Sequence, residues 1–129
     1  GRARRRALLA VTRGAASCAW QWGRAQRVGP CTRGRTGWER AGGLDARGAR
    51  LFEKGTFGSV ELAEYARAFD EVLLCGVCTD ICVVSNALLI KAFSPEARVM
   101  VAGRACAGVT PAAHAAALRT MESCQVEIV

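Results

Sequence analysis

Residues 49–129 of this 129-residue chain predict an α/β fold with a parallel sheet and helices on both faces. Short apolar runs typical of buried strands alternate with helical segments, and the connections between them are short. This alternation is typical of βαβ units, whose right-handed crossovers build a three-layer α/β/α sheet. Residues 1–48 have a different composition, so we expect the N-terminal part of this fold to be missing or replaced.

Capping residues and proline mark where the predicted helices begin and end. Ser59 and Thr110 are good N-caps, Pro111 suits a first helical position, and Pro95 ends the middle helix. In chain order we predict a strand-like piece at 51–54, a turn cluster at 55–59, a helix at 59–69 with Ser59 as its cap, and a strand at 71–76. A largely buried helix at 79–93, a strand at 98–103, a helix that begins at 111 and a strand at 124–129 follow.

The first segment is strongly basic. Residues 1–50 contain 12 Arg, no Lys and two acids, a net charge of +10, whereas residues 51–129 have a net charge of −3. Only five large aliphatic residues occur in residues 1–50, too few to offset about 1–2 kcal/mol of backbone ordering per residue. We therefore expect residues 1–48 to be disordered or foreign to the fold: a reading-frame error, a wrong start or a genuine basic arm.

Several functional classes are disfavoured by composition. The chain has no apolar run of about 18 residues, so we expect no membrane partner. The apolar part of residues 4–11 is too short for a signal peptide. A basic segment can bind nucleic acid, but the three Trp lie in a segment without a predicted fold, so nucleic acid is not expected as a partner. Seven Cys without disulfide-scaffold spacing favour a reducing cytoplasm.

The strongest candidate site lies between the strand at 71–76 and the helix at 79–93. Gly76 permits an unusual turn, Thr79 or Asp80 can cap the helix, and Cys82 falls in its first turn. A helix N-terminus favours a thiolate, and its N–H groups can bind a developing oxyanion. This placement indicates a nucleophile for acyl transfer, although a buried core thiol remains an alternative.

The segments GVCTDICVVSNALL and ACAGVTPAAHAAAL resemble the isochorismatase-like cysteine hydrolase family, which includes the nicotinamidases. The resemblance covers the C-terminal portion only, about the last 80 residues. It implies that Cys82 is the catalytic nucleophile, that the Val77–Cys78 peptide bond is cis, and that the N–H groups of Cys78 and Cys82 form the oxyanion hole. It also implies a catalytic Lys54, from the match of EKGTFGS to the family's lysine segment.

Two features of the family have no match in the sequence. The family's general base is an Asp at the end of the first strand, in a hydrophobic-x-hydrophobic-Asp-x-Gln segment, and we find no such segment before Lys54. Asp45 follows no strand-like run and is not assigned this role. The Asp-x-His metal segment of nicotinamidases is absent too, so neither a metal nor another cofactor is expected.

Other polar residues near the predicted site have two interpretations each. Asn86, one turn beyond Cys82, contacts substrate or satisfies a buried polar group; Phe57 forms a wall for a flat substrate or packs in the core. His114 shares a helical stripe with apolar residues and is expected to be structural. Cys75, Cys78 and Cys82 have a metal-like spacing but no fourth ligand, and Cys106 and Cys124 are expected in the core.

The sequence thus predicts a cysteine hydrolase that acts on a small amide or related C–N bond through a thioester, with activity impaired because the acid is lacking. The substrate is a small amide-like molecule whose identity the sequence does not define. A homo-oligomer is expected. The alternative is a non-catalytic α/β protein that binds a small molecule or acts in assembly.

Overall fold

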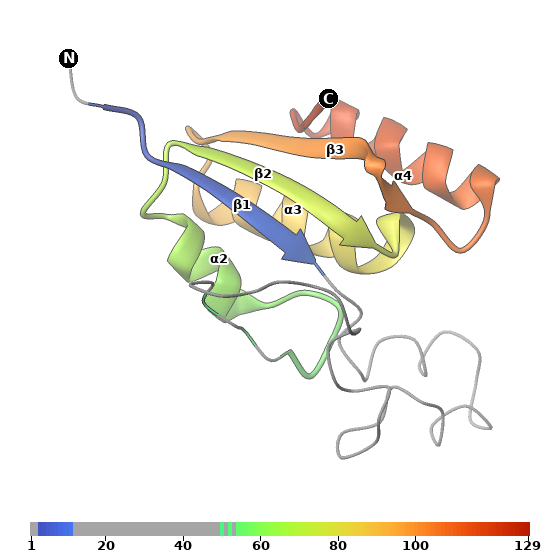
Figure 1. The fold of residues 1–129 in the computed structure, drawn as a ribbon, viewed down its shortest axis with the longest axis horizontal. Helices are drawn as coiled ribbons and strands as arrows, with labels where there is room; N and C mark the ends of the chain where they lie inside the picture. The colour runs from blue at the N-terminus through green and yellow to red at the C-terminus, as the bar shows by residue number, and fades with distance from the viewer. Residues whose placement is uncertain (1–2, 12–49, 51, 53) are drawn as a thin grey trace.

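The computed structural model describes residues 3–11, 50, 52 and 54–129, and these contain one parallel sheet (Figure 1). The strands are adjacent in the order β1-β2-β3-β4, and all three pairs are parallel. Their bounds are Arg6–Val11 for β1, Glu71–Val77 for β2, Arg98–Ala107 for β3 and Glu127–Ile128 for β4. The predicted parallel α/β architecture is confirmed.

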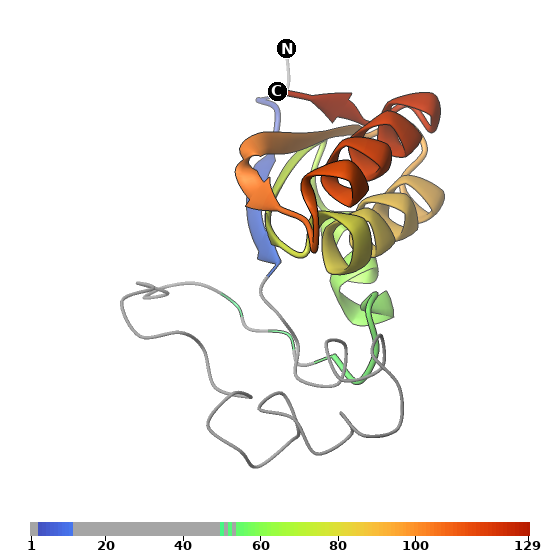
Figure 2. The same ribbon diagram turned by 90° about the vertical axis from the view of Figure 1, so that its right-hand side faces the viewer.

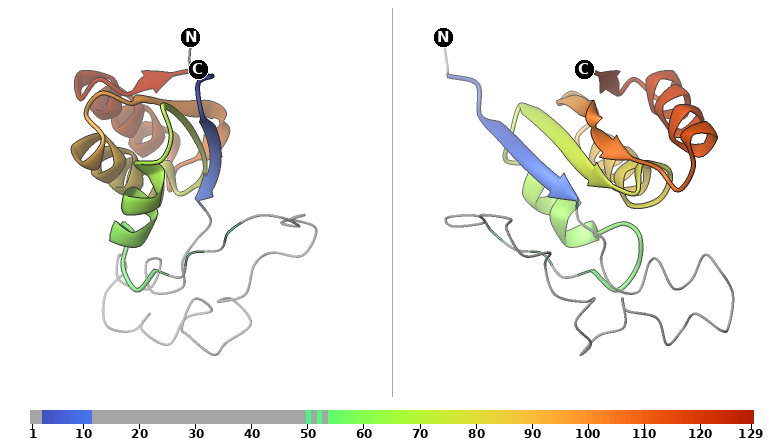
Figure 3. Two further views of the ribbon diagram at one scale, coloured as in Figure 1. Left: turned by 90° about the vertical axis from the view of Figure 1, so that its left-hand side faces the viewer. Right: turned by 45° about the vertical axis from the view of Figure 1, so that its right-hand side comes forward.

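All described helices lie on one face of this sheet, as the side views show (Figures 2 and 3). Each strand lies beside its predecessor and the order never reverses, so right-handed crossovers place every connecting helix on the same side. The described residues therefore do not form the predicted arrangement with helices on both faces of the sheet. No described helix is long and apolar enough to cross a membrane. The helices are α2, Val60–Ala66; η3, Thr79–Val83; α3, Val84–Phe93; and α4, Pro111–Ser123.

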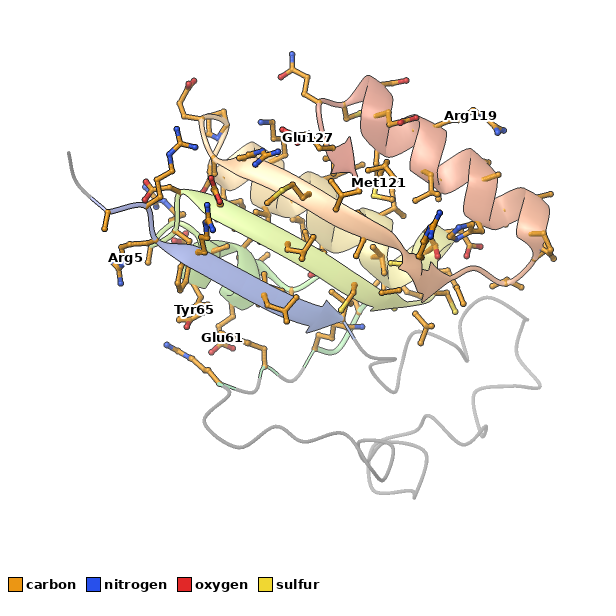
Figure 4. All side chains as sticks on the ribbon, turned by 45° about the horizontal axis from the view of Figure 1, so that its top comes forward. Arg5, Glu61, Tyr65, Arg119, Met121 and Glu127 are labelled. Atoms are coloured by element: carbon orange, nitrogen blue, oxygen red, sulfur yellow. The ribbon has the colours of Figure 1, made fainter. Side chains whose placement is uncertain are left out.

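The core lies between the sheet and this helical layer. Apolar residues on alternate positions of the strands meet small and apolar residues of the helices. Met121 of α4 points toward the sheet, whereas Arg119 points away from it (Figure 4). The fully buried members with the largest side chains include Val72, Leu74, Ile90, Val99, Val101 and Met121.

Strand β1 corrects the prediction for residues 1–48. Arg6–Val11 pairs with β2 in unbroken register from Arg6 opposite Glu71 to Val11 opposite Gly76, so this stretch is neither disordered nor foreign to the sheet. Its few apolar residues suffice because Val11, which is 3% exposed, completes a core that residues 54–129 supply. The other residues of the segment, apart from 3–5, and the predicted boundary at 48/49 lie outside the described residues.

Charged side chains hold the amino-terminal end of β1 against β2. Arg4 Nη1 donates to Glu71 Oε1 at 3.0 Å, and Arg6 Nε lies 2.6 Å from Glu71 Oε2. The Arg4 hydrogen bond and the charge of Arg6 lower the pKa of Glu71 against an opposing desolvation. Farther along the same end of the sheet, Arg98 of β3 pairs with Glu127 of β4.

This cluster makes stability depend on Glu71 and on pH. A carboxylate whose pKa is lowered in the folded state adds stability above its unfolded pKa and loses it as the pH falls through the folded value. Glu71→Gln is therefore expected to lower the urea midpoint at pH 7, with the difference from the parent shrinking below about pH 4. Glu64→Gln, which removes only an exposed pair with Arg67, is the control and should change the midpoint little. A Glu71→Gln deficit that stays constant from pH 7 to pH 3 would contradict this account.

Candidate functional site

Cys82 lies at the carboxyl end of the sheet, in the turn that joins β2 to α3. The strand ends at Val77, the Val77–Cys78 peptide bond is cis as predicted, and η3 begins at Thr79. Gly76 has φ +133°, and a Cβ there would overlap the carbonyl oxygen of Val11. The glycine therefore lets the end of β1 approach the turn that leads to Cys82. Cys82 itself is buried, with 1% of its surface exposed.

The first turn of this helix is a π turn. The Cys78 carbonyl accepts from the N–H groups of Ile81 and Val83, both at 3.1 Å. Single π turns inside α-helices occur frequently at functional sites. The observed cap residue is Cys78 and not Thr79 or Asp80 as predicted. The side chains of Thr79 and Asp80 instead bind His114 and the Val109 N–H. Asp80 Oδ1 accepts from the Val109 N–H at 3.0 Å, which ties the loop after β3 to this turn.

Lys54 lies beside the thiol. Its Nζ is 3.4 Å from Cys82 Sγ, although the two residues are 28 positions apart in the sequence. The structure therefore brings together the two residues that the sequence singled out as catalytic. The Lys54 ammonium can donate a hydrogen bond to the sulfur at this distance, and the contact is partly buried.

Asn86 connects the two segments that carry Lys54 and Cys82. Its Nδ2 donates to the carbonyl oxygens of Cys82 at 2.7 Å and Phe57 at 3.1 Å, and its Oδ1 accepts from the Ser59 N–H at 2.9 Å. The side chain is 0% exposed. These contacts favour the structural interpretation of Asn86 over substrate contact. Phe57 is partly buried and packs against the core cluster, which favours its packing role.

His114 of α4 supports the same turn from the other side. Its Nδ1 lies 2.8 Å from Oγ1 of Thr79, which is fully buried. It is the only His of the chain, and it is used structurally. Within the described ranges no three His, Cys, Asp or Glu side chains come together as a metal site. No set of side chains among the described residues therefore fits the metal of nicotinamidases.

The remaining described cysteines differ in environment. Burial raises the pKa of the Cys106 thiol, against a hydrogen bond with the backbone of Gly76, and so favours its neutral form. Cys75 and Cys106 are each partly buried. Cys124 is exposed, so its predicted place in the core is wrong; it follows the last turn of α4 rather than lying within a strand. Cys124 is therefore a convenient internal reference for labelling.

The fold and this turn define an α/β protein with a cysteine at a strand-to-helix junction, beside a lysine. The isochorismatase domain model matches residues 18–129, most of the chain. The chain belongs to the isochorismatase domain family, a family of hydrolases. The family match begins at residue 18, whereas the sequence analysis placed the start of the family-like domain at residue 49.

Solved structures of this family share the fold. PnC1 from L. infantum, in complex with nicotinate, superimposes with a TM-score of 0.71 at 20% identity over 96% of this chain and 70% of that one. Nicotinamidase PncA from Bacillus subtilis gives a TM-score of 0.64 at 25% identity over 95% and 73%. The pyrazinamidase of Pyrococcus horikoshii, in complex with zinc, gives 0.64 at 24% identity over 96% and 73%. None of the curated protein sequences compared with the chain matches it.

Proposed function

We propose that the chain is a cysteine hydrolase for a small amide or related C–N bond, with Cys82 as nucleophile. The observation that carries this proposal is the 3.4 Å approach of Lys54 Nζ to Cys82 Sγ. A thiolate is the reactive form of cysteine, and the Lys54 ammonium lies within hydrogen-bond distance of this sulfur at a helix start. The family match supports the reaction class.

The reaction proceeds in two halves. Cys82 Sγ forms a bond to the substrate's carbonyl carbon, and the N–H groups of Cys78 and Cys82 hold the resulting oxyanion. Collapse of this intermediate breaks the C–N bond, and the leaving nitrogen takes the proton that the Cys82 thiol gave up. Water then attacks the thioester carbonyl, which breaks the C–S bond and releases the carboxylic acid, and a proton of that water returns to Cys82 Sγ. Lys54 interacts with the sulfur while it carries charge in these two steps.

The proton carrier is the incomplete part of the machinery. The resemblance implies an Asp at the end of the first strand, after a hydrophobic-x-hydrophobic run, and β1 is the first strand of the described residues. In the sequence, Leu9-Ala10-Val11 is followed by Thr12, so the hydrophobic-x-hydrophobic pattern is present but the acid is not. We therefore propose that hydrolysis by this chain is impaired at proton transfer. A non-catalytic protein that binds a small molecule is the second candidate, and the same replacement favours it.

Nicotinamide is the first substrate to test. One similar structure is described as a nicotinamidase and another as a complex with nicotinate, the carboxylate that hydrolysis of the nicotinamide carboxamide releases. Pyrazinamide and aliphatic amides are the comparison set.

Labelling kinetics test the Cys82–Lys54 pair without requiring turnover. Lys54→Met keeps the side-chain length and removes the charge, so iodoacetamide should label Cys82 about tenfold more slowly at neutral pH. Cys124, which is exposed and in the same chain, should react at an unchanged rate. Peptide mapping by mass spectrometry reports both rates in one sample. An unchanged Cys82 rate in Lys54→Met would show that the lysine does not activate this thiol.

A further inference from the structure

We infer that Asn86 is a positioning residue that holds the Lys54 segment against Cys82. This inference rests on the proposed function, because it gives Asn86 a role through the Cys82–Lys54 pair. The amide lies between the two segments and binds the main chain of both (on one side Cys82, on the other Phe57 and Ser59). It touches neither reactive side-chain atom through these bonds.

The hydrogen-bond pattern fixes the orientation of the Asn86 amide and uses both of its N–H donors. Two carbonyl acceptors require the NH₂ group, and the Ser59 N–H requires the oxygen. Both Nδ2 protons are therefore used, and the side chain is completely buried. A residue in this state has no donor to offer a substrate, so its contribution acts on the geometry of the site.

The lysine segment depends on this contact for its position. Residues 55–58 form bends rather than a helix or strand, and α2 begins only after Ser59. The segment lies close to α3, because a Cβ at Gly58 would collide with the side chain of Leu89. Asn86 is on that same helix, four residues after Cys82, and so links the lysine segment directly to the helix of the nucleophile.

A double-mutant cycle on Cys82 labelling tests the inference. In the parent chain, Lys54→Met is expected to slow iodoacetamide labelling of Cys82 about tenfold. If Asn86 acts through Lys54, Asn86→Ala should slow labelling by a similar factor, and adding Lys54→Met to it should cause little further change. An undiminished tenfold effect of Lys54→Met in the Asn86→Ala background would overturn the inference. An absent effect of Lys54→Met in the parent would instead overturn the proposed function.

Ser59→Ala is the matched control. It removes the hydroxyl that caps α2 through the Leu62 N–H, while the Ser59 backbone N–H that binds Asn86 remains. This variant loosens the same helix start but should leave the Cys82 rate, relative to Cys124, within twofold of the parent. A slowing as large as that of Asn86→Ala would mean that general loosening, not positioning, explains the effect.

Hydrogen exchange of the parent chain tests the contact without any substitution. N-terminal N–H groups of a helix usually lack a partner within the helix, so the amide of an N-cap residue exchanges quickly unless another group binds it. The Ser59 amide is expected to be protected to a degree similar to the core of α3. Fast exchange at Ser59 would overturn the inference even if Asn86→Ala failed to fold.

Discussion

Thr12→Asp is expected to raise Cys82-dependent hydrolysis of nicotinamide by about 10²–10⁴-fold, the usual contribution of a general acid–base group. The chain with Thr12 is expected to show no measurable turnover. The substitution places a carboxylate directly after Val11 in the sequence, and the end of β1 lies against Gly76 at the start of the nucleophile turn. The resemblance implies an acid at this point of the sequence as the group that takes the thiol proton and returns it to the leaving nitrogen.

Two controls separate this effect from a change in folding. Thr12→Asn has nearly the size of Asp without its charge and should give no turnover. Cys82→Ala in the Thr12→Asp background should abolish whatever is gained. Ammonia release by purified protein compares the activity of four proteins, which are the parent, Thr12→Asp, Thr12→Asn, and Thr12→Asp with Cys82→Ala. Robust Cys82-dependent turnover by the chain with Thr12 would contradict the account, because another group would then serve as the base.

Gly76→Ala is expected to cause the largest loss of stability of any conservative change at the site, about 3 kcal/mol or more. Two costs add at this position. A residue with a Cβ is strained at φ +133°, and the new methyl would overlap the Val11 carbonyl oxygen. Because the obstacle is backbone, relief requires β1 to move away from β2, which also opens the site.

Gly55→Ala is the matched control for this prediction. A Cβ at Gly55 meets nothing within 4 Å, so the free energy of unfolding of Gly55→Ala should stay within about 0.5 kcal/mol of the parent value. Urea unfolding followed by circular dichroism compares the three chains. Equal midpoints for Gly76→Ala and Gly55→Ala would mean that β1 does not pack against Gly76 in solution.

Most of the sheet was predictable because its strands and helices carry local signals. The apolar run at 71–76, the caps Ser59 and Thr110, and Pro111 correspond to observed starts and strands. Strand β1 is not predicted, because the five large aliphatic residues of residues 1–50 are too few to build a core of their own. The run Ala7-Leu8-Leu9-Ala10-Val11 was the available signal, since a strand that joins an existing sheet needs only a few apolar residues.

Only part of the site could be predicted, because some of its residues belong to local motifs and others depend on contacts between distant segments. Cys82 and Lys54 follow from short motifs, and the structure places them in contact. The role of Asn86 depends on which main-chain groups surround it, and no sequence pattern reports that. The pairing of Thr79 with His114 likewise joins residues 35 positions apart. The layer of helices on one face follows from strand order, which is a property of the whole sheet.

Covalent trapping tests the central claim most directly. An activated ester of nicotinic acid can acylate a competent nucleophile without the acid that protonates an amine leaving group. We expect one nicotinoyl group per chain, attached to the peptide that contains Cys82, with slower acylation in Lys54→Met and none at that peptide in Cys82→Ser under the same conditions. Mass spectrometry of the digested protein locates the group. Acylation of Cys78 or Cys124 in place of Cys82, or a rate at Cys82 that does not depend on Lys54, would contradict the account.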